Sequence, residues 1–169
     1  MRTRIAAALL LIAVSASPSL SARADDGAPW RATSPRVQLE AADHHLELVI
    51  PAGRARGATS RAVPIEPGGT YVAIARLELD CLVARGAFLR VALYARDDGT
   101  GRQRARLDST LVRESADGVV VLFRAPRWAR AAKLRVLARP DRGGAGLDAM
   151  DPLLIRVERA PAVVLRPDE

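Results

Sequence analysis

The sequence predicts an all-β protein, a sandwich or barrel built from many short strands. Three observations carry this prediction. Short runs of alternating residues recur along the chain, turn-forming residues separate them, and no stretch of useful length has helical periodicity. Because successive strand side chains point to opposite faces, such alternation places one set in a core and the other on an outer sheet face.

The N-terminus has the three parts of an export signal. Arg2 and Arg4 form a basic start, and an apolar run of about ten residues follows from Ile5 to Val14. Ala22-Arg23-Ala24 then supplies a signal-peptidase site. The apolar run is far shorter than the roughly 20 residues that span a bilayer, although an uncleaved anchor stays an alternative. We therefore expect a signal peptide at 1–24 and a periplasmic or secreted protein without stable membrane insertion.

The rest of the chain is expected to form one domain. Residues 25–35 form a polar lead-in with two prolines, which we expect to be flexible, residues 36–160 form the sandwich, and residues 161–169 form a tail. The expected strands are Val37–Ala41, His45–Ile50, Arg61–Glu66, Thr70–Leu79, Ala87–Ala95, Arg104–Val112, Gly118–Ala125, Ala131–Ala138 and Leu153–Glu158. Turn signals between them include Pro51-Ala52-Gly53, Pro67-Gly68-Gly69, Asp97-Asp98-Gly99, Asp117-Gly118, Pro140 to Gly144 and Asp151-Pro152.

Charge and cysteine content narrow the classes of function. The chain has 26 basic and 19 acidic residues, and all but Lys133 of the basic residues are arginine. Such a bias is typical of GC-rich genomes, and together with export it argues against a nucleic-acid partner. The single cysteine, Cys81, cannot form an intramolecular disulfide and lies in an apolar run, which favours a buried thiol over a reactive one.

Three stretches of the sequence form a distinctive series: Ile65 to Ala75, Leu89 to Gly99, and Phe123 to Pro126 with the strand after it. Together they resemble the galactose-binding-like β-sandwich of many carbohydrate-binding modules, which implies a jelly-roll β-sandwich of about eight to nine antiparallel strands. Ile65 to Ala75 is similar to that family's "PG-x-x-Y" start of a core strand, with Tyr71 closing the sandwich edge. Leu89 to Gly99 is similar to its strand that ends in an acidic-Gly hairpin, and Phe123-Arg124-Ala125-Pro126 with the strand after it is similar to its "F-x-A-P" pattern. Tyr71 and Phe123 are expected to be buried. The resemblance implies a fold and a glycan-binding module, but the aromatic content of 4% is low for sugar-stacking platforms.

The resemblance also implies a possible structural calcium ion near an Asp before the last strand. Asp148 or Asp151 matches that position, since hard cations prefer carboxylate and carbonyl oxygens, although a turn role is the alternative. We expect no other cofactor. His44 and His45 are adjacent and point to opposite faces of a strand, so they do not form a joint metal clamp. Asp97 to Gly101 lacks the alternating aspartates of a calcium loop and is interpreted as a hairpin turn.

No nucleophile elbow or paired-acid arrangement is evident, so we expect no enzyme. The most distinctive chemical feature of the sequence is a predicted outer sheet face rich in basic residues. Outward positions hold Arg76, Arg90, Tyr94, Arg124, Lys133, Arg135 and Arg156. The predicted ligand-binding residues are Arg90, Tyr94, Arg124, Trp128 and Arg135, because arginine forks bind carboxylate or sulfate groups bidentately and aromatic rings stack on sugars. A merely solvated sheet face is the alternative.

These features predict an exported, non-catalytic binding module for a cell-surface or extracellular glycan, in particular an anionic polysaccharide. The alternative is a structural or protein-interaction module in an envelope or polysaccharide-export assembly. An exposed Arg90, Tyr94 or Trp128 on a concave face favours the first, and an exposed apolar surface favours the second.

Overall fold

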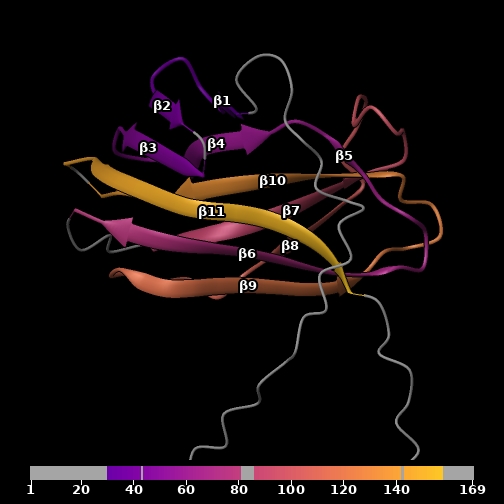
Figure 1. Ribbon diagram of the computed structural model, residues 1–169. Helices are drawn as coiled ribbons and strands as arrows, with labels where there is room; N and C mark the ends of the chain where they lie inside the picture. Colours follow the sequence, from indigo (N-terminus) through magenta and orange to yellow (C-terminus); the bar gives the residue numbers. More distant parts are fainter. Residues whose placement is uncertain (1–29, 43, 81–85, 142, 158–169) are drawn as a thin grey trace, which may run out of the picture.

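The computed structural model describes residues 30–42, 44–80, 86–141 and 143–157, which form two antiparallel sheets (Figure 1). The six-stranded sheet runs β1 (Trp30–Ala32), β4 (Arg56–Ser60), β10 (Ala131–Ala138), β7 (Ala87–Tyr94) and β8 (Ala105–Asp108), with β5 (Val63–Pro64) beside β10. The five-stranded sheet runs β2 (Gln38–Ala42), β3 (His45–Ile50), β11 (Ala145–Val157), β6 (Thr70–Leu79) and β9 (Ala116–Arg124). The predicted all-β sandwich is confirmed. The predicted signal peptide and tail, and Cys81, lie outside the described residues.

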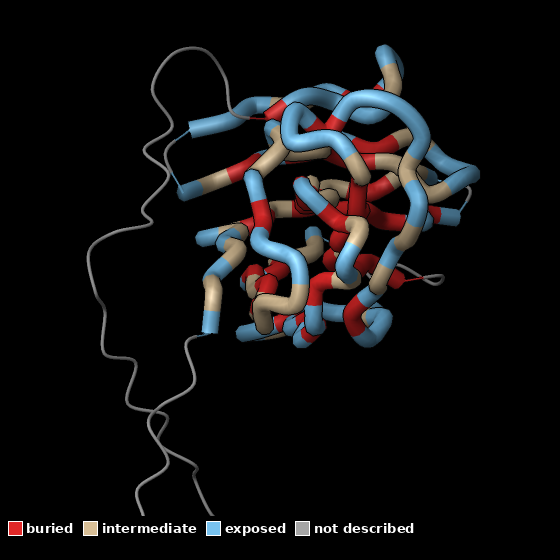
Figure 2. The backbone as a smooth tube through the Cα atoms, turned by 90° about the vertical axis from the view of Figure 1, so that its right-hand side faces the viewer, coloured by how far each residue is buried: buried red, intermediate tan, exposed pale blue. Residues whose placement is uncertain are grey.

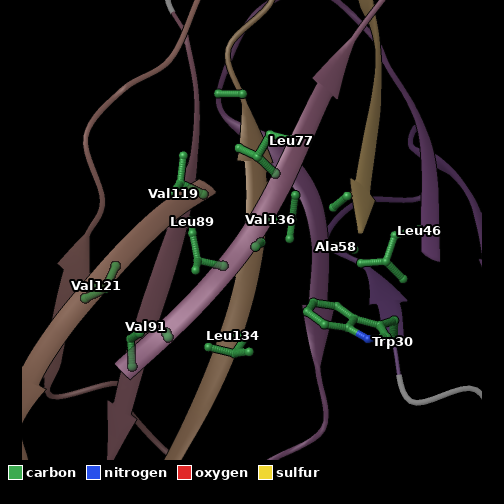
Figure 3. Packing of buried hydrophobic residues seen from close by; sticks show 14 of the residues in the cluster. Trp30, Leu46, Ala58, Leu77, Leu89, Val91, Val119, Val121, Leu134 and Val136 are labelled. Atoms are coloured by element: carbon green, nitrogen blue, oxygen red, sulfur yellow. The ribbon is translucent and has the colours of Figure 1, made fainter. Parts of the chain in front are cut away.

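The core lies between the two sheets, where buried residues gather (Figure 2). Leu89 and Val91 of β7, Val136 of β10 and Leu77 of β6 belong to one core cluster and are fully buried (Figure 3). The alternation read from the sequence gives these strands the expected phase, with every second residue inside. Burial of this apolar surface is the main term that stabilises the sandwich.

The two aromatic residues expected in the core are there. Tyr71 and Phe123 occupy paired positions on β6 and β9 and are each 5% exposed. Their rings stack with centroids 5.6 Å apart. The Tyr71 hydroxyl accepts a hydrogen bond from the backbone N–H of Glu66 at 2.7 Å, so its polar end is satisfied despite burial.

Eleven strands are present in the described ranges, more than the eight to nine predicted. β1 lies within residues 25–35, which were expected to be flexible. This strand is ordered because Trp30, only 8% exposed, packs in the core. β4 was missed because its small and polar residues lack an aliphatic alternation. Gly57 explains that composition, since a Cβ there would collide with the Val136 carbonyl of β10.

The last strand departs from the prediction in two ways. It begins at Ala145 rather than Leu153, and the expected turn at Asp151-Pro152 is a β-bulge within it, with Asp151 at φ 47°. A bulge adds one residue, so the outward set changes from even to odd positions along β11. Leu153 is therefore exposed, whereas Arg156 lies opposite Tyr71 instead of on the outer face and pairs with Glu66.

A second turn signal is also inside a strand. Asp117-Gly118 forms an irregularity in β9: from Ala75 to Leu77, β6 advances by two residues, while its partner β9 advances by three, between Val119 and Ala116.

In the part of the chain that the structure describes, no helix has the length and apolarity needed to cross a membrane.

Candidate functional site

The outer face of the six-stranded sheet gathers most of the predicted binding residues. Strand pairing aligns Thr59 of β4, Arg135 of β10, Arg90 of β7 and Asp108 of β8 in one row across the sheet. We call this surface the basic face, because five cations stand on it against one carboxylate: Arg31, Arg90, Arg106, Lys133 and Arg135 against Asp108.

Arg124 is not part of this row. It lies on β9, which belongs to the five-stranded sheet, and its Nε donates a hydrogen bond to the Gly68 carbonyl at 3.1 Å. The expectation that Arg90, Arg124 and Arg135 share one sheet is therefore wrong. Sequence alternation reports whether a residue points outward, but it does not report to which of the two layers its strand belongs.

Arg90 is held by an acidic partner that the sequence did not reveal. Its Nε and Nη2 donate to the two carboxylate oxygens of Asp108 at 2.6 and 2.7 Å, and its guanidinium lies over the Phe88 ring at 5.1 Å. Hydrogen bonds from Arg90 lower the pKa of Asp108, and the same contact raises the pKa of Arg90. Asp108 occupies the edge of the Arg90 guanidinium, Nε and Nη2, that would bind an anion through two hydrogen bonds. Arg90 therefore links β7 to β8 and does not offer a free anion site.

Arg135 differs from Arg90 in having unused hydrogen-bonding capacity. One terminal nitrogen donates to the Tyr94 hydroxyl at 2.9 Å, but its covered Nε has no hydrogen-bond partner among the described residues. The hydroxyl of Thr59, in the paired position on β4, is also covered and has no partner there. Buried polar groups usually are satisfied, and leaving one unpaired costs about 1–3 kcal/mol. Both atoms are covered, so a ligand group could bond to them only if the side chains over them moved.

Tyr94 does not provide an exposed stacking surface. It is 5% exposed, and the Lys133 ammonium lies 5.1 Å from its ring centroid. The β7–β8 loop covers this end of the face, since Gly99 lies directly against Ala62 and Lys133. A second small apolar cluster thus packs between the loop and the sheet, formed by Ala62, Ala92, Tyr94 and Ala131.

Trp128 lies in the β9–β10 connection, partly buried against the main core, with the Arg104 guanidinium 5.8 Å from its ring centroid. Neither predicted aromatic therefore stands as a bare platform beside the arginines. Any recognition on the basic face depends on charge and hydrogen bonds rather than on ring stacking.

The two aspartates predicted for calcium lie on β11, on the other sheet. Asp148 approaches His45 at 3.6 Å, and Asp151 approaches His44 at 3.2 Å. Within the described ranges no group of three or more His, Cys, Asp or Glu side chains is placed to hold a metal ion. Since calcium takes about six to eight oxygen ligands, these two side chains do not by themselves form a site, and the calcium ion stays a prediction.

Neither a protein-family model nor a curated protein sequence matches this chain. Solved structures do match in fold. The N-terminal cellulose-binding domain of a Cellulomonas fimi β-1,4-glucanase C is 19% identical with a TM-score of 0.53, over 80% of this chain and 94% of that one. The enzymatically active domain of tailspike protein 4 of bacteriophage CBA120 is 12% identical with a TM-score of 0.56, over 76% of this chain and 19% of that one.

A third similar structure contains the CBM22-1 and GH10 modules of a Clostridium thermocellum xylanase 10B complexed with xylohexaose. It is 14% identical with a TM-score of 0.51, over 77% of this chain and 26% of that one. The chain thus spans about a fifth of the tailspike domain and about a quarter of the xylanase. The resemblance to the sandwich of carbohydrate-binding modules is confirmed for the fold.

Proposed function

We propose that this chain is an exported, non-catalytic module that binds an anionic glycan on its basic face. The observation that carries the proposal is the excess of cations in the outward strand positions of that face, five against one carboxylate, with Arg135 and Lys133 partly exposed. The unpartnered Arg135 Nε–H and Thr59 hydroxyl stand in paired strand positions on the same face but are covered. The shared fold with glycan-binding modules supports the same class of ligand.

The chemistry of the face favours an acidic sugar over a neutral one. Neutral glycans depend on aromatic surfaces for their apolar C–H faces, whereas Tyr94 is covered here. A uronate carboxylate or a sulfate accepts several N–H donors at once, and Arg135 and Lys133 are partly exposed neighbours on β10. Asp108 neutralises Arg90, so the positive charge that an acidic sugar would meet comes from Arg135, Lys133 and the remaining cations of the face.

Retardation in gels that contain a uronic-acid polymer tests the proposal. The polymer should slow wild type relative to a polymer-free gel. It should slow the Arg135→Ala and Lys133→Ala variants less. Added salt should reduce the retardation of wild type, because exposed charges are screened within about 8 Å at physiological ionic strength. A gel with a neutral glucan should retard none of the proteins.

Arg124→Ala is the matched control, since it removes the same charge from the opposite sheet. At a protein concentration low enough to keep the chain monomeric, it should be retarded like wild type. Equal loss of binding in Arg124→Ala and Arg135→Ala would show that net charge, not a site, causes the retardation. Retardation of Arg135→Ala equal to that of wild type would contradict the proposed site.

A protein-interaction module is the second candidate function. The observation that favours it is a group of exposed aliphatic side chains on the five-stranded sheet, among them Val120 at 50% and Leu122 at 66% exposure. The two functions use opposite faces of the sandwich and are compatible in one chain.

A further inference from the structure

The outer face of the five-stranded sheet carries a continuous aliphatic surface. Strand pairing places the side chains in two rows that each cross β11, β6 and β9. We call them the aliphatic strip, and the rows are Leu153–Ile74–Val120 and Ile155–Val72–Leu122. The three strands lie side by side on one side of the sandwich (Figure 1).

The exposure of the strip is high for aliphatic residues. Leu153 and Ile155 are 43% and 42% exposed, and the two β9 residues are exposed further. Single exposed aliphatic residues are ordinary, but four that flank the half-buried Val72 and Ile74 in adjacent strand positions mark an interaction surface. β9 also ends the sheet, so its outer edge is unpaired within the described residues.

The charges at the two ends of β9 indicate what covers the strip. Arg124 stands at one end of the strand and Asp117 at the other, with the two aliphatic rows between them. The Asp117 side chain is wholly exposed, and among the described residues its ion-pair contact is with Arg76 Nε, long at 3.8 Å. Arg76 makes its shorter contact, 2.8 Å, with Glu78. Asp117 therefore has most of its charge available to a partner.

This arrangement is self-complementary. A two-fold rotation about an axis that crosses the strands between the two rows reverses the strand direction. The Leu153–Ile74–Val120 row of one copy then lies over the Ile155–Val72–Leu122 row of the other copy. Val120 faces Leu122, and Leu153 faces Ile155. The same rotation brings Arg124 of each copy over Asp117 of the other, so both ends of the interface carry opposite charges.

We propose that two copies of this chain associate face to face through the aliphatic strip. Packed sheets lie about 10 Å apart, and their side chains interdigitate in the space between. The contact is isologous, so the same residues serve both copies and the assembly closes as a dimer. The basic faces then point outward on opposite sides, which allows one dimer to engage two glycan segments.

Sedimentation velocity of the full chain over a wide range of concentrations tests the dimer. Wild type should move from monomer to dimer as its concentration rises. Leu122→Lys should stay monomeric, because a charge buried in the strip is costly to desolvate. Val49→Lys is the matched control, since Val49 is also 50% exposed on this sheet but lies on β3 outside the strip, and it should dimerise like wild type. Thermal unfolding checks that each variant is folded.

Exchanging the charges tests the two-fold register itself. Arg124→Asp and Asp117→Arg should each weaken the dimer, and the double variant should restore it, because the rotation pairs these two positions between copies. A wild type that stays monomeric at all concentrations would overturn the proposal. A dimer that Leu122→Lys leaves intact, or one that the double exchange does not restore, would overturn it as well.

Discussion

Replacing Phe123 with Ala should lower the free energy of unfolding by about 3–5 kcal/mol. The side chain is 5% exposed, so nearly all of its apolar surface is withdrawn from water. Its ring also stacks on Tyr71 at 5.6 Å, a contact that contributes about 0.5–1.5 kcal/mol beyond burial. One kcal/mol moves the melting temperature of a domain of this size by roughly 3–6 °C, so a fall of about 10–30 °C is expected.

Thermal unfolding of dilute, monomeric protein followed by circular dichroism measures this change, and Leu122→Ala is the control. Leu122 precedes Phe123 on the same strand but is 66% exposed, so its truncation should shift the melting temperature by only a few degrees. A Phe123→Ala variant that melts within a degree or two of wild type would refute the assignment of Phe123 to the inner face. Equal falls for the two variants would contradict the phase of β9.

Three further predictions concern the ion pair of the basic face, the backbone and export. Hydrogen bonds from Arg90 lower the pKa of Asp108, and such a carboxylate adds stability above its unfolded pKa of about 3.9 that is lost as the pH falls through the folded value. The melting temperature of wild type should therefore drop more steeply below about pH 4 than that of Asp108→Asn; parallel curves would count against the pair. Gly57→Ala should melt lower than wild type, because a Cβ there meets the backbone of β10, whereas Gly118→Ala has open space and should melt like wild type. N-terminal sequencing of the exported protein should show cleavage after Ala24, and an intact N-terminus on a membrane-bound product would refute a cleaved signal.

The long, regular strands could be predicted from the sequence because alternation and turn residues agree there. The expected boundaries His45–Ile50, Thr70–Leu79 and Ala131–Ala138 match β3, β6 and β10. The short strands could not be predicted in this way. β1 has three residues and β4 owes its glycine to close contact with β10, so their pairing depends on neighbours far away in the sequence.

The last strand shows a different limit of sequence reasoning. Asp151-Pro152 has the composition of a turn, yet pairing with β6 continues on both sides of it. The bulge reverses the outward set of the strand, so a simple alternation placed Arg156 on the wrong face. The exposed aliphatic strip was hidden for the same reason, since Leu153 and Ile155 have the sequence pattern of core residues.

Part of the candidate site could be predicted as well. Arg90 and Arg135 were expected to point outward, and β7 and β10 place them opposite each other. Their different roles could not be predicted, because Asp108 joins Arg90 only through the register of β7 with β8. Thr59 was missed because its strand was missed.

The central claim, an anionic-glycan site on the basic face, is tested most directly by backbone amide NMR during titration with a uronic-acid oligosaccharide. The claim predicts the largest shift changes on the six-stranded sheet, at Thr59, Lys133 and Arg135, with small changes on β6, β9 and β11. Changes confined to those three strands of the five-stranded sheet, or none with any acidic oligosaccharide, would contradict it.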